Sequence, residues 1–198
     1  MKKLLLGIAA VCLAGFTFAQ DAPLWMRHSV ISPDGTTIAF TYKGDIYTVP
    51  VAGGRAMQIT TNPAYDTAPV WSPDSKRIAF ASDRMGSLDV YIVAKDGGEP
   101  RRLTTHSGSE TPLAFTDAGH VLFSAGIMPS AEAVVFPSNG QFNQVYRVSV
   151  EGGRPTMISS MPMECISINK EGAMLYQDKK GYEDYWRKHH VSPIARDI

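Results

Sequence analysis

Short apolar segments alternate with polar turns along most of the chain, and the same arrangement recurs at a nearly fixed spacing. Residues 32–40 and residues 72–80 share a Ser-Pro-Asp start and an Ile-Ala-Phe end. Weaker copies occupy residues 116–123 and 169–176. A Pro-Asp-Gly turn before a run of β-branched and aromatic residues predicts a tight turn that leads into a short buried strand.

A second motif follows three of these copies. It consists of a strand with Tyr at its centre, a Gly-Gly pair and a short closing strand, and it begins at residues 45, 89 and 144. The Gly-Gly pair supplies the positive φ angles that a hairpin turn requires. A further strand is expected before each Pro-Asp turn, for example at residues 68–71, so each unit contains four short strands. Four short strands about every forty residues are typical of a propeller blade.

We therefore predict an all-β fold, a β-propeller of four-stranded blades with about three and a half blades and an incomplete ring. A β-sandwich also has many short strands, but it does not repeat one turn and one strand at a fixed spacing. The expected organisation is a signal peptide followed by a partial propeller whose fourth blade is incomplete. The expected bounds are 1–19 for the signal peptide and 24–198 for the propeller, with blades near 24–62, 63–106, 107–161 and 162–198.

Two further features bear on this organisation. Residues 126–142 interrupt the third unit and are expected to form a long loop on one face of the propeller. Residues 196–198 fall where the Tyr-containing strand of the fourth unit should begin. We therefore expect the chain to be the N-terminal part of a longer polypeptide. Because an unpaired sheet edge invites association, we also expect the chain alone to self-associate.

The N-terminus has the plan of a secretory signal peptide. Two lysines, Lys2 and Lys3, precede an apolar stretch, and residues 17–19 place small residues before a cleavage point at residue 20. Cys12 lies within this stretch, but the residues before it fit a lipoprotein signal poorly. We expect an exported protein, periplasmic or secreted. No later segment is long and apolar enough to predict a membrane span.

Composition excludes some classes of partner. The chain has 19 basic and 19 acidic residues and no basic run, so no nucleic acid is expected as a partner. One of the two cysteines lies in the signal peptide, which leaves Cys165 without an intrachain disulfide partner. Cys165 is expected to be a small buried side chain on a strand.

The chain is expected to hold no catalytic centre. There is no Gly-x-Ser-x-Gly motif. Ser107 and Ser109 lie near His106 and Glu110, but all four follow the last strand of a blade, where solvated turn residues are ordinary. Adjacent His189 and His190 point to opposite faces of a strand, so they do not share one metal ion. For His28, His106 and His120 we expect packing or hydrogen bonds at a propeller face, and we expect no cofactor or metal site.

The remaining polar and aromatic candidates have structural interpretations. Asp34 and Asp74 are expected to accept backbone N–H groups within their turns. Four acidic residues are expected to cap turns or to pair with Arg84 and Arg187 rather than to act as acid and base. These residues are Asp83, Asp89, Glu183 and Asp184. Aromatic residues Trp71 and Trp186 are expected to pack between blades rather than to line a peptide-binding surface.

Residues 71–74 (Trp-Ser-Pro-Asp) together with residues 78–84 (Ile-Ala-Phe-Ala-Ser-Asp-Arg) resemble the blades of TolB and of tricorn-type serine peptidases. Two stretches are more similar to exported tricorn-type peptidases. They are residues 44–47 (Gly-Asp-Ile-Tyr) and residues 182–190, which lead to residues 195–198. The resemblance covers residues 24–198, and the blade motif itself is widely shared.

The resemblance implies a catalytic activity for the parent protein rather than for this chain. In the tricorn-type family the propellers come first, and a PDZ-containing catalytic region with a nucleophilic serine follows far downstream. The propellers gate or channel peptide substrates. No catalytic residue of the family matches a position here, so the resemblance implies a non-catalytic propeller segment that contacts a peptide or protein substrate.

Two alternatives remain open at this point. One is a TolB-like periplasmic propeller that binds proteins in envelope complexes and performs no reaction. The other is the propeller of a prolyl-oligopeptidase-type enzyme, which carries an α/β-hydrolase domain. The sequence downstream separates these alternatives, because each one requires a different continuation of the chain.

Overall fold

The structure is a computed structural model that describes residues 25–126, 143–161, 163–169 and 171–178. Within these residues the chain forms three four-stranded antiparallel sheets and one two-stranded pair. The expected signal peptide, most of the insertion at residues 126–142 and the last twenty residues lie outside the described part.

The first sheet contains β1 (Arg27–Ile31), β2 (Thr37–Tyr42), β3 (Asp45–Pro50) and β4 (Met57–Gln58). The second sheet contains β5 (Asp66–Trp71), β6 (Arg77–Ser82), β7 (Asp89–Ala94) and β8 (Arg101–Arg102). The third sheet contains β9 (Glu110–Asp117), β10 (His120–Ala125), β11 (Gln144–Ser149) and β12 (Thr156–Ser159). The pair contains β13 (Met163–Ile168) and β14 (Met174–Asp178).

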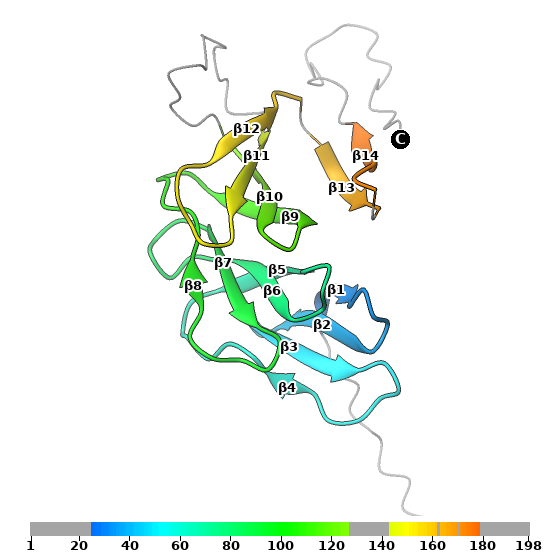
Figure 1. Ribbon diagram of the computed structural model, residues 1–198. Coiled ribbons are helices and arrows are strands. Elements are labelled where there is room, and N and C mark those ends of the chain that lie inside the picture. Colours follow the sequence, from blue (N-terminus) through cyan, green and yellow to red (C-terminus); the bar gives the residue numbers. More distant parts are fainter. Residues whose placement is uncertain (1–24, 127–142, 162, 170, 179–198) are drawn as a thin grey trace, which may run out of the picture.

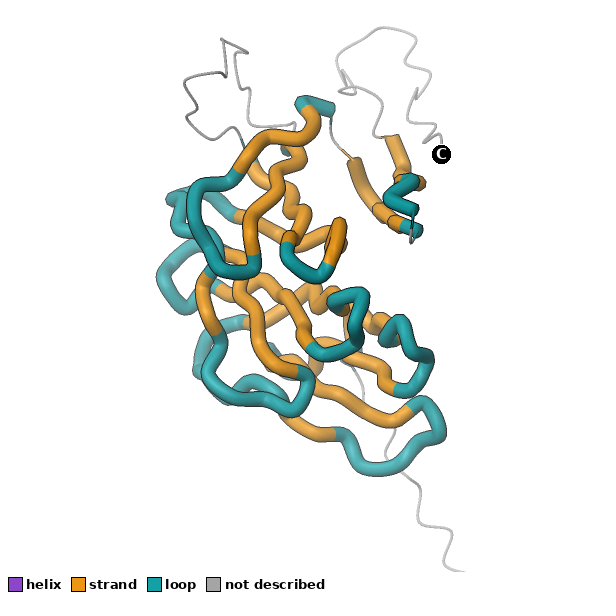
Figure 2. Tube along the Cα trace, in the orientation of Figure 1, coloured by secondary structure: helices purple, strands orange, loops and turns teal. Residues whose placement is uncertain are grey.

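Each sheet is a meander in which strands adjacent in sequence are also hydrogen-bonded neighbours. Figure 1 shows the sheets following one another along a curve, and Figure 2 shows that the described chain consists of strands joined by turns. The first strands of successive sheets contact each other, β1 with β5, β5 with β9 and β9 with β13. This arrangement of blades confirms the predicted all-β propeller fold. The exact bounds of the four blades stay a prediction, since residues 24, 162 and 198 are not described.

An aromatic pair recurs at the same place in all three sheets. Phe40 and Tyr47 are register partners on β2 and β3, and their ring centroids lie 5.8 Å apart. The corresponding pairs are Phe80–Tyr91 at 5.9 Å and Phe123–Tyr146 at 5.7 Å. The Phe of the first sequence motif therefore stacks on the Tyr of the second one in every blade, which explains why the two motifs recur together.

The apolar core lies between the blades. One cluster joins the first and second sheets and includes Ile46, Ile78 and Phe80, all of them inaccessible to solvent. A second cluster joins the second and third sheets and includes Val90 and Phe123. Each sheet thus buries apolar side chains against its neighbour, so the burial that stabilises one blade depends on the presence of the next blade.

The predicted turns are present. In the first copy the N–H of Gly35 donates to the carbonyl of Ser32 at 2.8 Å, and Gly35 has a φ of 72°. In the second copy Ser75 takes the same place with a φ of 57°. The Asp of each turn accepts a backbone N–H, from Thr36 at 3.0 Å and from Lys76 at 3.1 Å. These contacts confirm the expected roles of Asp34 and Asp74.

We expect the Asp74→Ala variant to lower the free energy of unfolding by about 1 kcal/mol. The carboxylate of Asp74 accepts the Ser72 hydroxyl at 2.5 Å and the Lys76 N–H, and alanine removes both hydrogen bonds. Urea unfolding followed by circular dichroism measures the change. The matched control is Asp96→Ala, because Asp96 is an exposed residue of another turn. Equal stability of the two variants would contradict a role of Asp74 in holding the turn.

The position of Cys165 corrects the sequence prediction. Cys165 lies on strand β13, as expected, but its side chain is exposed rather than buried. It has a φ of 52°, and the register of β13 against β14 shifts between residues 164 and 167. His28 on β1 and Ala68 on β5 have the same positive φ at the same kind of register shift. Cys165 is thus the bulge residue of a first strand, and the bulge changes the direction in which its side chain points.

Candidate functional site

The connections between strands gather at two ends of the sheets. One end carries the Pro-Asp and Gly-Gly turns. The other end carries the connections from second to third strands and from each fourth strand to the next blade. We call this second end the loop face. In the first two blades it comprises residues 43–44, 59–65, 83–88 and 103–109.

At the loop face, the first blade is joined to the second through Asp66, the first residue of β5. The Asp66 N–H donates to the carbonyl of Gly44 at 2.7 Å, and its carboxylate is inaccessible to solvent. Arg84 donates through Nη2 to both carboxylate oxygens, at 3.0 and 2.9 Å. The Arg84 guanidinium also lies over the rings of Tyr91, at 4.6 Å, and Phe80, at 5.6 Å. A buried ion pair stacked on aromatic rings is thus built into this joint.

These contacts correct part of the sequence interpretation. Asp83 was expected to cap a turn or to pair with Arg84, and it does cap, because the Tyr65 N–H donates to Asp83 Oδ1 at 2.8 Å. Arg84, however, pairs with Asp66. Asp89 pairs with Arg102, whose Nη2 lies 2.8 Å from Asp89 Oδ2. The partners of Arg84 and Asp89 lie 18 and 13 residues away in sequence, where proximity along the chain is no guide.

The contact between the second and third blades has the same backbone hydrogen bond, with Glu110 in the place of Asp66. The N–H of Glu110, the first residue of β9, donates to the carbonyl of Leu88 at 2.7 Å. Both Glu110 and Asp89 are inaccessible to solvent. The Thr104 hydroxyl donates to Glu110 Oε2 at 3.0 Å and accepts the Val90 N–H at 2.9 Å. Each contact between blades therefore holds two carboxyl groups near one arginine, Asp45 and Asp66 near Arg84 in the first and Asp89 and Glu110 near Arg102 in the second.

The pKa of Glu110 is raised to about 7, first by burial and then by the nearby Asp89 carboxyl group, while the Thr104 hydrogen bond and the charge of Arg102 act in the opposite direction. A proton is therefore held at this pair of carboxyl groups near neutral pH. The imidazole of His106 faces the pair, with Nδ1 3.5 Å from Glu110 Oε1. The same Nδ1 accepts the Gly108 N–H at 3.0 Å. Ser107 and Ser109 are exposed, as expected, but Glu110 is buried at the start of β9, which corrects the expectation of a solvated turn residue there.

A pocket of about 220 Å³ opens at the first joint on the loop face. Its lining consists of Trp25, Arg27, Thr41, Lys43, Gly44 and Tyr65. Thr41 is 2% exposed, and within the described part of the chain its hydroxyl oxygen has no hydrogen-bond partner. The guanidinium carbon of Arg27 lies 5.4 Å from the Trp25 ring centroid. Sequence reasoning did not anticipate this pocket, because its residues come from three separate segments.

The other predicted residues have local structural roles. His28 Nδ1 lies 3.0 Å from the Thr67 hydroxyl, and His120 Nδ1 lies 3.0 Å from Asp117 Oδ1. Trp71 packs between the first two blades and donates through Nε1 to the carbonyl of Val30 at 3.2 Å, which confirms its expected packing role. The other candidates fall outside the described residues. They are Glu183, Asp184, Trp186, Arg187, His189 and His190.

Two negative findings apply to the described residues alone. In that part of the chain no group of three or more His, Cys, Asp or Glu side chains is placed to hold a metal ion. Within the same residues no helix is long and apolar enough to cross a membrane.

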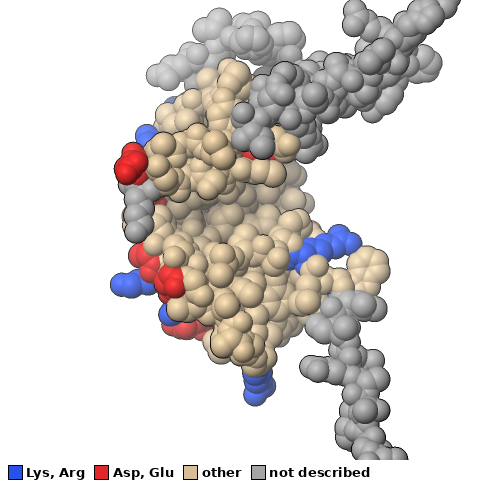
Figure 3. Space-filling view, turned by 90° about the vertical axis from the view of Figure 1, so that its right-hand side faces the viewer, with Lys and Arg blue, Asp and Glu red and all other residues tan. Residues whose placement is uncertain are grey.

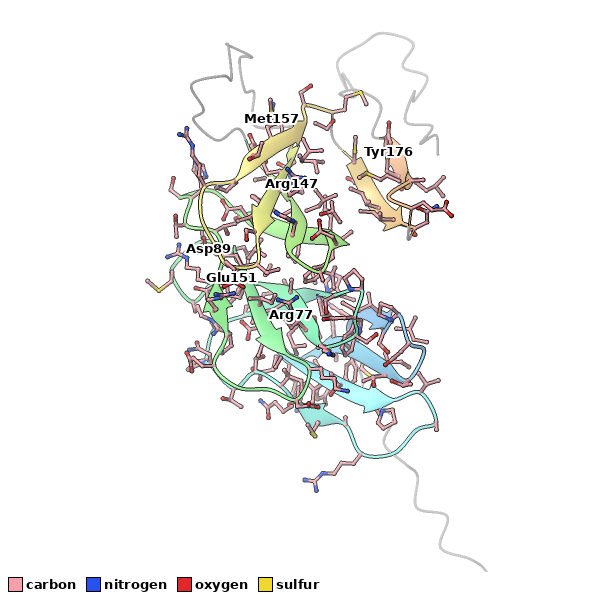
Figure 4. All side chains as sticks on the ribbon, in the orientation of Figure 1. Arg77, Asp89, Arg147, Glu151, Met157 and Tyr176 are labelled. Atoms are coloured by element: carbon pink, nitrogen blue, oxygen red, sulfur yellow. The ribbon has the colours of Figure 1, made fainter. Side chains whose placement is uncertain are left out.

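Charged side chains link the blades at the turn-bearing end as well. Arg101 pairs with Glu151, with 2.8 Å between Nη1 and Oε2, and Arg77 donates to the carbonyl of Ala118. Figure 4 labels Arg77 and Glu151 near the border of the second and third sheets. Figure 3 shows a hollowed surface that is mostly uncharged, with acidic and basic side chains at its margins.

Comparison with known proteins identifies relatives of this chain. A relative named tricorn protease homolog 1, from Streptomyces coelicolor, is 35% identical over 102 residues, which are 51% of this chain and 9% of that protein. An uncharacterized peptidase, YuxL of Bacillus subtilis, is 30% identical over 129 residues, 64% of this chain and 20% of that protein. The chain thus spans a small part of the length of these curated relatives.

A solved structure and a family match extend the comparison. The structure of a putative TolB from Agrobacterium tumefaciens superimposes with a TM-score of 0.64 at 17% sequence identity, over 80% of this chain and 55% of that one. At this identity the likeness shows the fold. Residues 23–194 match the family described as the tricorn protease N-terminal beta propeller domain. Since this match takes in nearly the whole chain, the chain belongs to the family of tricorn protease N-terminal β-propeller domains.

Proposed function

We propose that this chain is the non-catalytic propeller segment of a larger exported serine peptidase of the tricorn type, and that it binds peptides or proteins on their way to the catalytic region. The family match over residues 23–194 carries this proposal. The peptidase names of two relatives at 30% and 35% identity support it, and so does the small share of those relatives that the chain spans.

The loop face is the part of the segment that this proposal assigns to ligand contact. The pocket at the first joint and the exposed rings of Trp25 and Tyr65 lie there. The buried side chains of Asp66, Asp89 and Glu110 stabilise the joints beneath this surface. Scaffold groups and contact groups are therefore separate, as in other folds whose rigid strands carry functional loops.

A TolB-like binding propeller is the second candidate. The likeness in fold to a putative TolB, over 80% of this chain, supports it. This candidate performs no reaction and contacts proteins of the cell envelope. Both candidates use the loop face for contact with a ligand. They differ because the parent protein of a TolB-like propeller has no catalytic serine.

An antibody raised against residues 25–105 tests the proposal in cells that make the native protein. We expect it to precipitate, from the exported fraction, a protein several times heavier than the 21.6 kDa chain. We also expect a fluorophosphonate probe, which modifies activated serines, to label that protein. A heavy band without label would overturn the serine-peptidase assignment, and an unlabelled band near 21.6 kDa would overturn it as well. Recovery with the cytoplasmic proteins would overturn export.

A further inference from the structure

The pocket at the first joint presents two positive charges that no acidic residue in the described part of the chain neutralises. Arg27 and Lys43 both line it, and neither forms an ion pair with an acidic residue in the described part of the chain. Both cations instead lie over aromatic rings, Arg27 over Trp25 and Lys43 over Tyr42, each at 5.4 Å. A cation over a ring keeps its N–H donors free to bind an anion.

Three acidic residues of the same joint have partners within the protein, and one of them, Asp83, accepts the Tyr65 N–H at 2.8 Å. Asp66 accepts both of its hydrogen bonds from Arg84. Asp45 accepts the Gln58 amide at 3.0 Å and the Thr60 hydroxyl at 3.3 Å. These carboxylates point to their own partners in the joint, so the positive charge of the pocket remains available to a ligand.

Thr41 lines the pocket, and its side chain carries an unpaired hydrogen-bonding group. The Thr41 hydroxyl is buried, and in the described residues it has no partner. An unpaired buried hydroxyl destabilises the protein, and a ligand atom that reaches it and pairs with it removes that cost. A carboxylate oxygen accepts a hydrogen bond from such a hydroxyl and attracts both cations at the same time.

The aromatic walls of the pocket favour a ligand that also has an apolar group. The rings of Trp25 and Tyr65 line the pocket and are 72% and 42% exposed, so they present uncovered apolar surface. Gly44 lies against the Tyr65 ring, because a Cβ at Gly44 would be 3.5 Å from Tyr65 Cδ2. The Tyr65 ring is thereby held at the pocket edge, where it can cover a ligand side chain.

We propose that this pocket binds a carboxylate group of a peptide, with an apolar side chain of the same peptide packed between Trp25 and Tyr65. The carboxylate comes from the end of the peptide chain or from an acidic side chain next to an apolar one. The carboxylate part rests on the pocket alone. The peptide part rests on the proposed function, which supplies peptides as ligands of the loop face.

Small probes test the carboxylate part without any assumption about peptidase activity. Saturation-transfer NMR on the full chain measures the Kd of N-acetyl-leucine and of N-acetyl-leucinamide, which differ only in the charged group. We expect the acid to bind at least about tenfold more tightly than the amide. Equal Kd values would overturn carboxylate recognition, whatever the result of the antibody and fluorophosphonate experiment.

Peptides then distinguish the two sources of the carboxylate. The probes are acetyl-Ala-Ala-Leu as a free acid, the same peptide as an amide, and acetyl-Ala-Glu-Leu-amide. Tighter binding of the first identifies the chain end as the source, and tighter binding of the third identifies the side chain. If neither binds more tightly than N-acetyl-leucine, the peptide part is overturned while the carboxylate part stands.

Three variants and one matched control locate the binding to this pocket. We expect Arg27→Gln and Lys43→Gln each to weaken binding of the acid about tenfold, with little effect on the amide. Arg55→Gln is the control, because Arg55 is an exposed cation near the Gly-Gly turn at the other end of the first sheet. Thr41→Val keeps the shape of the side chain and removes its hydroxyl, and we expect it to weaken acid binding several-fold without lowering the melting temperature. An Arg55→Gln effect as large as that of Arg27→Gln would overturn the assignment.

Discussion

Replacing Arg84 with alanine is expected to lower the free energy of unfolding by about 3–5 kcal/mol. The change leaves the Asp66 carboxylate, which is inaccessible to solvent, without the two hydrogen bonds that it accepts from Arg84. It also removes the guanidinium from the rings of Tyr91 and Phe80. Because Asp66 joins the second blade to Gly44 of the first, the loss weakens the contact between blades.

Urea unfolding of the chain measures this effect, and Arg101→Ala provides the matched control. Arg101 forms an ion pair with Glu151, but the two side chains are 48% and 75% exposed. Exposed ion pairs contribute about 0–1 kcal/mol, so this variant should unfold nearly as the unaltered chain does. If Arg84→Ala were no more destabilising than Arg101→Ala, the buried pair would not be the main polar contact of the first joint.

Stability is expected to fall as the pH rises from about 4.5 to about 7, because of the buried pair of carboxyl groups at the second joint. The pKa of Glu110 is raised from 4.5 to about 7, first by burial, so the folded chain binds this proton more tightly than the unfolded chain does. The resulting stabilisation is complete below about pH 4.5 and is lost as the pH rises through about 7. We expect a loss of roughly 1–3 kcal/mol over this interval.

The groups that face Glu110 determine this behaviour. They are Asp89 on β7, Arg102 on β8, and Thr104 and His106 in the connection that precedes Glu110. We expect Glu110→Gln to remove most of the pH dependence between pH 5 and pH 8, because glutamine keeps an acceptor for Thr104 and does not ionise. Thermal unfolding across this range measures it, and Glu99→Gln, at an exposed position, is the control. An unchanged pH profile in Glu110→Gln would show that another group is responsible.

The opposite dependence is expected at more acidic pH. The pKa values of Asp34 and Asp74 are lowered, in each case first by the hydroxyl of the serine two residues earlier. Groups with a lowered pKa stabilise the folded chain above their unfolded value, near 3.8, and lose this contribution as the pH falls further. The chain should therefore be most stable between these two limits, at weakly acidic pH.

The repeated parts of the fold could be predicted from sequence because their contacts are local or recur at a fixed spacing. The turn residues Asp34 and Asp74 bond within two positions of themselves, so their role follows from the motif alone. The blade architecture follows from the recurrence of the two motifs at residues 32–49 and 72–93. In such cases propensity, pattern and turn chemistry all indicate the same structure.

The polar joints could not be predicted in the same way, because they depend on contacts between strands of different blades. The pairing of Arg84 with Asp66 and the burial of Glu110 appear only when the sheets are placed side by side. A signal was nonetheless present in the sequence, since Asp45 and Asp89 are separated by 44 residues, and so are Asp66 and Glu110. A spacing shared by two acidic positions that begin strands indicates equivalent places in successive blades.

Cys165 and the pocket show two further limits. A cysteine on a strand is usually buried, but Cys165 is exposed at a bulge of β13, and single bulges leave little trace in a sequence. The pocket combines residues 25–27, 41–44 and 65, none of which forms a recognisable motif. Its charge and its unpaired hydroxyl are properties of the assembled joint.

The joint between blades also suggests how such a chain can grow in evolution. The second and third blades begin with a residue whose N–H donates to the preceding blade, from Asp66 to Gly44 and from Glu110 to Leu88. Each blade also presents, between its second and third strands, the carbonyl that the next blade requires. A duplicated gene segment that encodes one blade would therefore encode both the N–H donor and the carbonyl acceptor of this hydrogen bond. The new blade could then bond to the blades on both sides. Substitution of the acidic residue could then change each contact independently, as with Asp66 at one contact and Glu110 at the next.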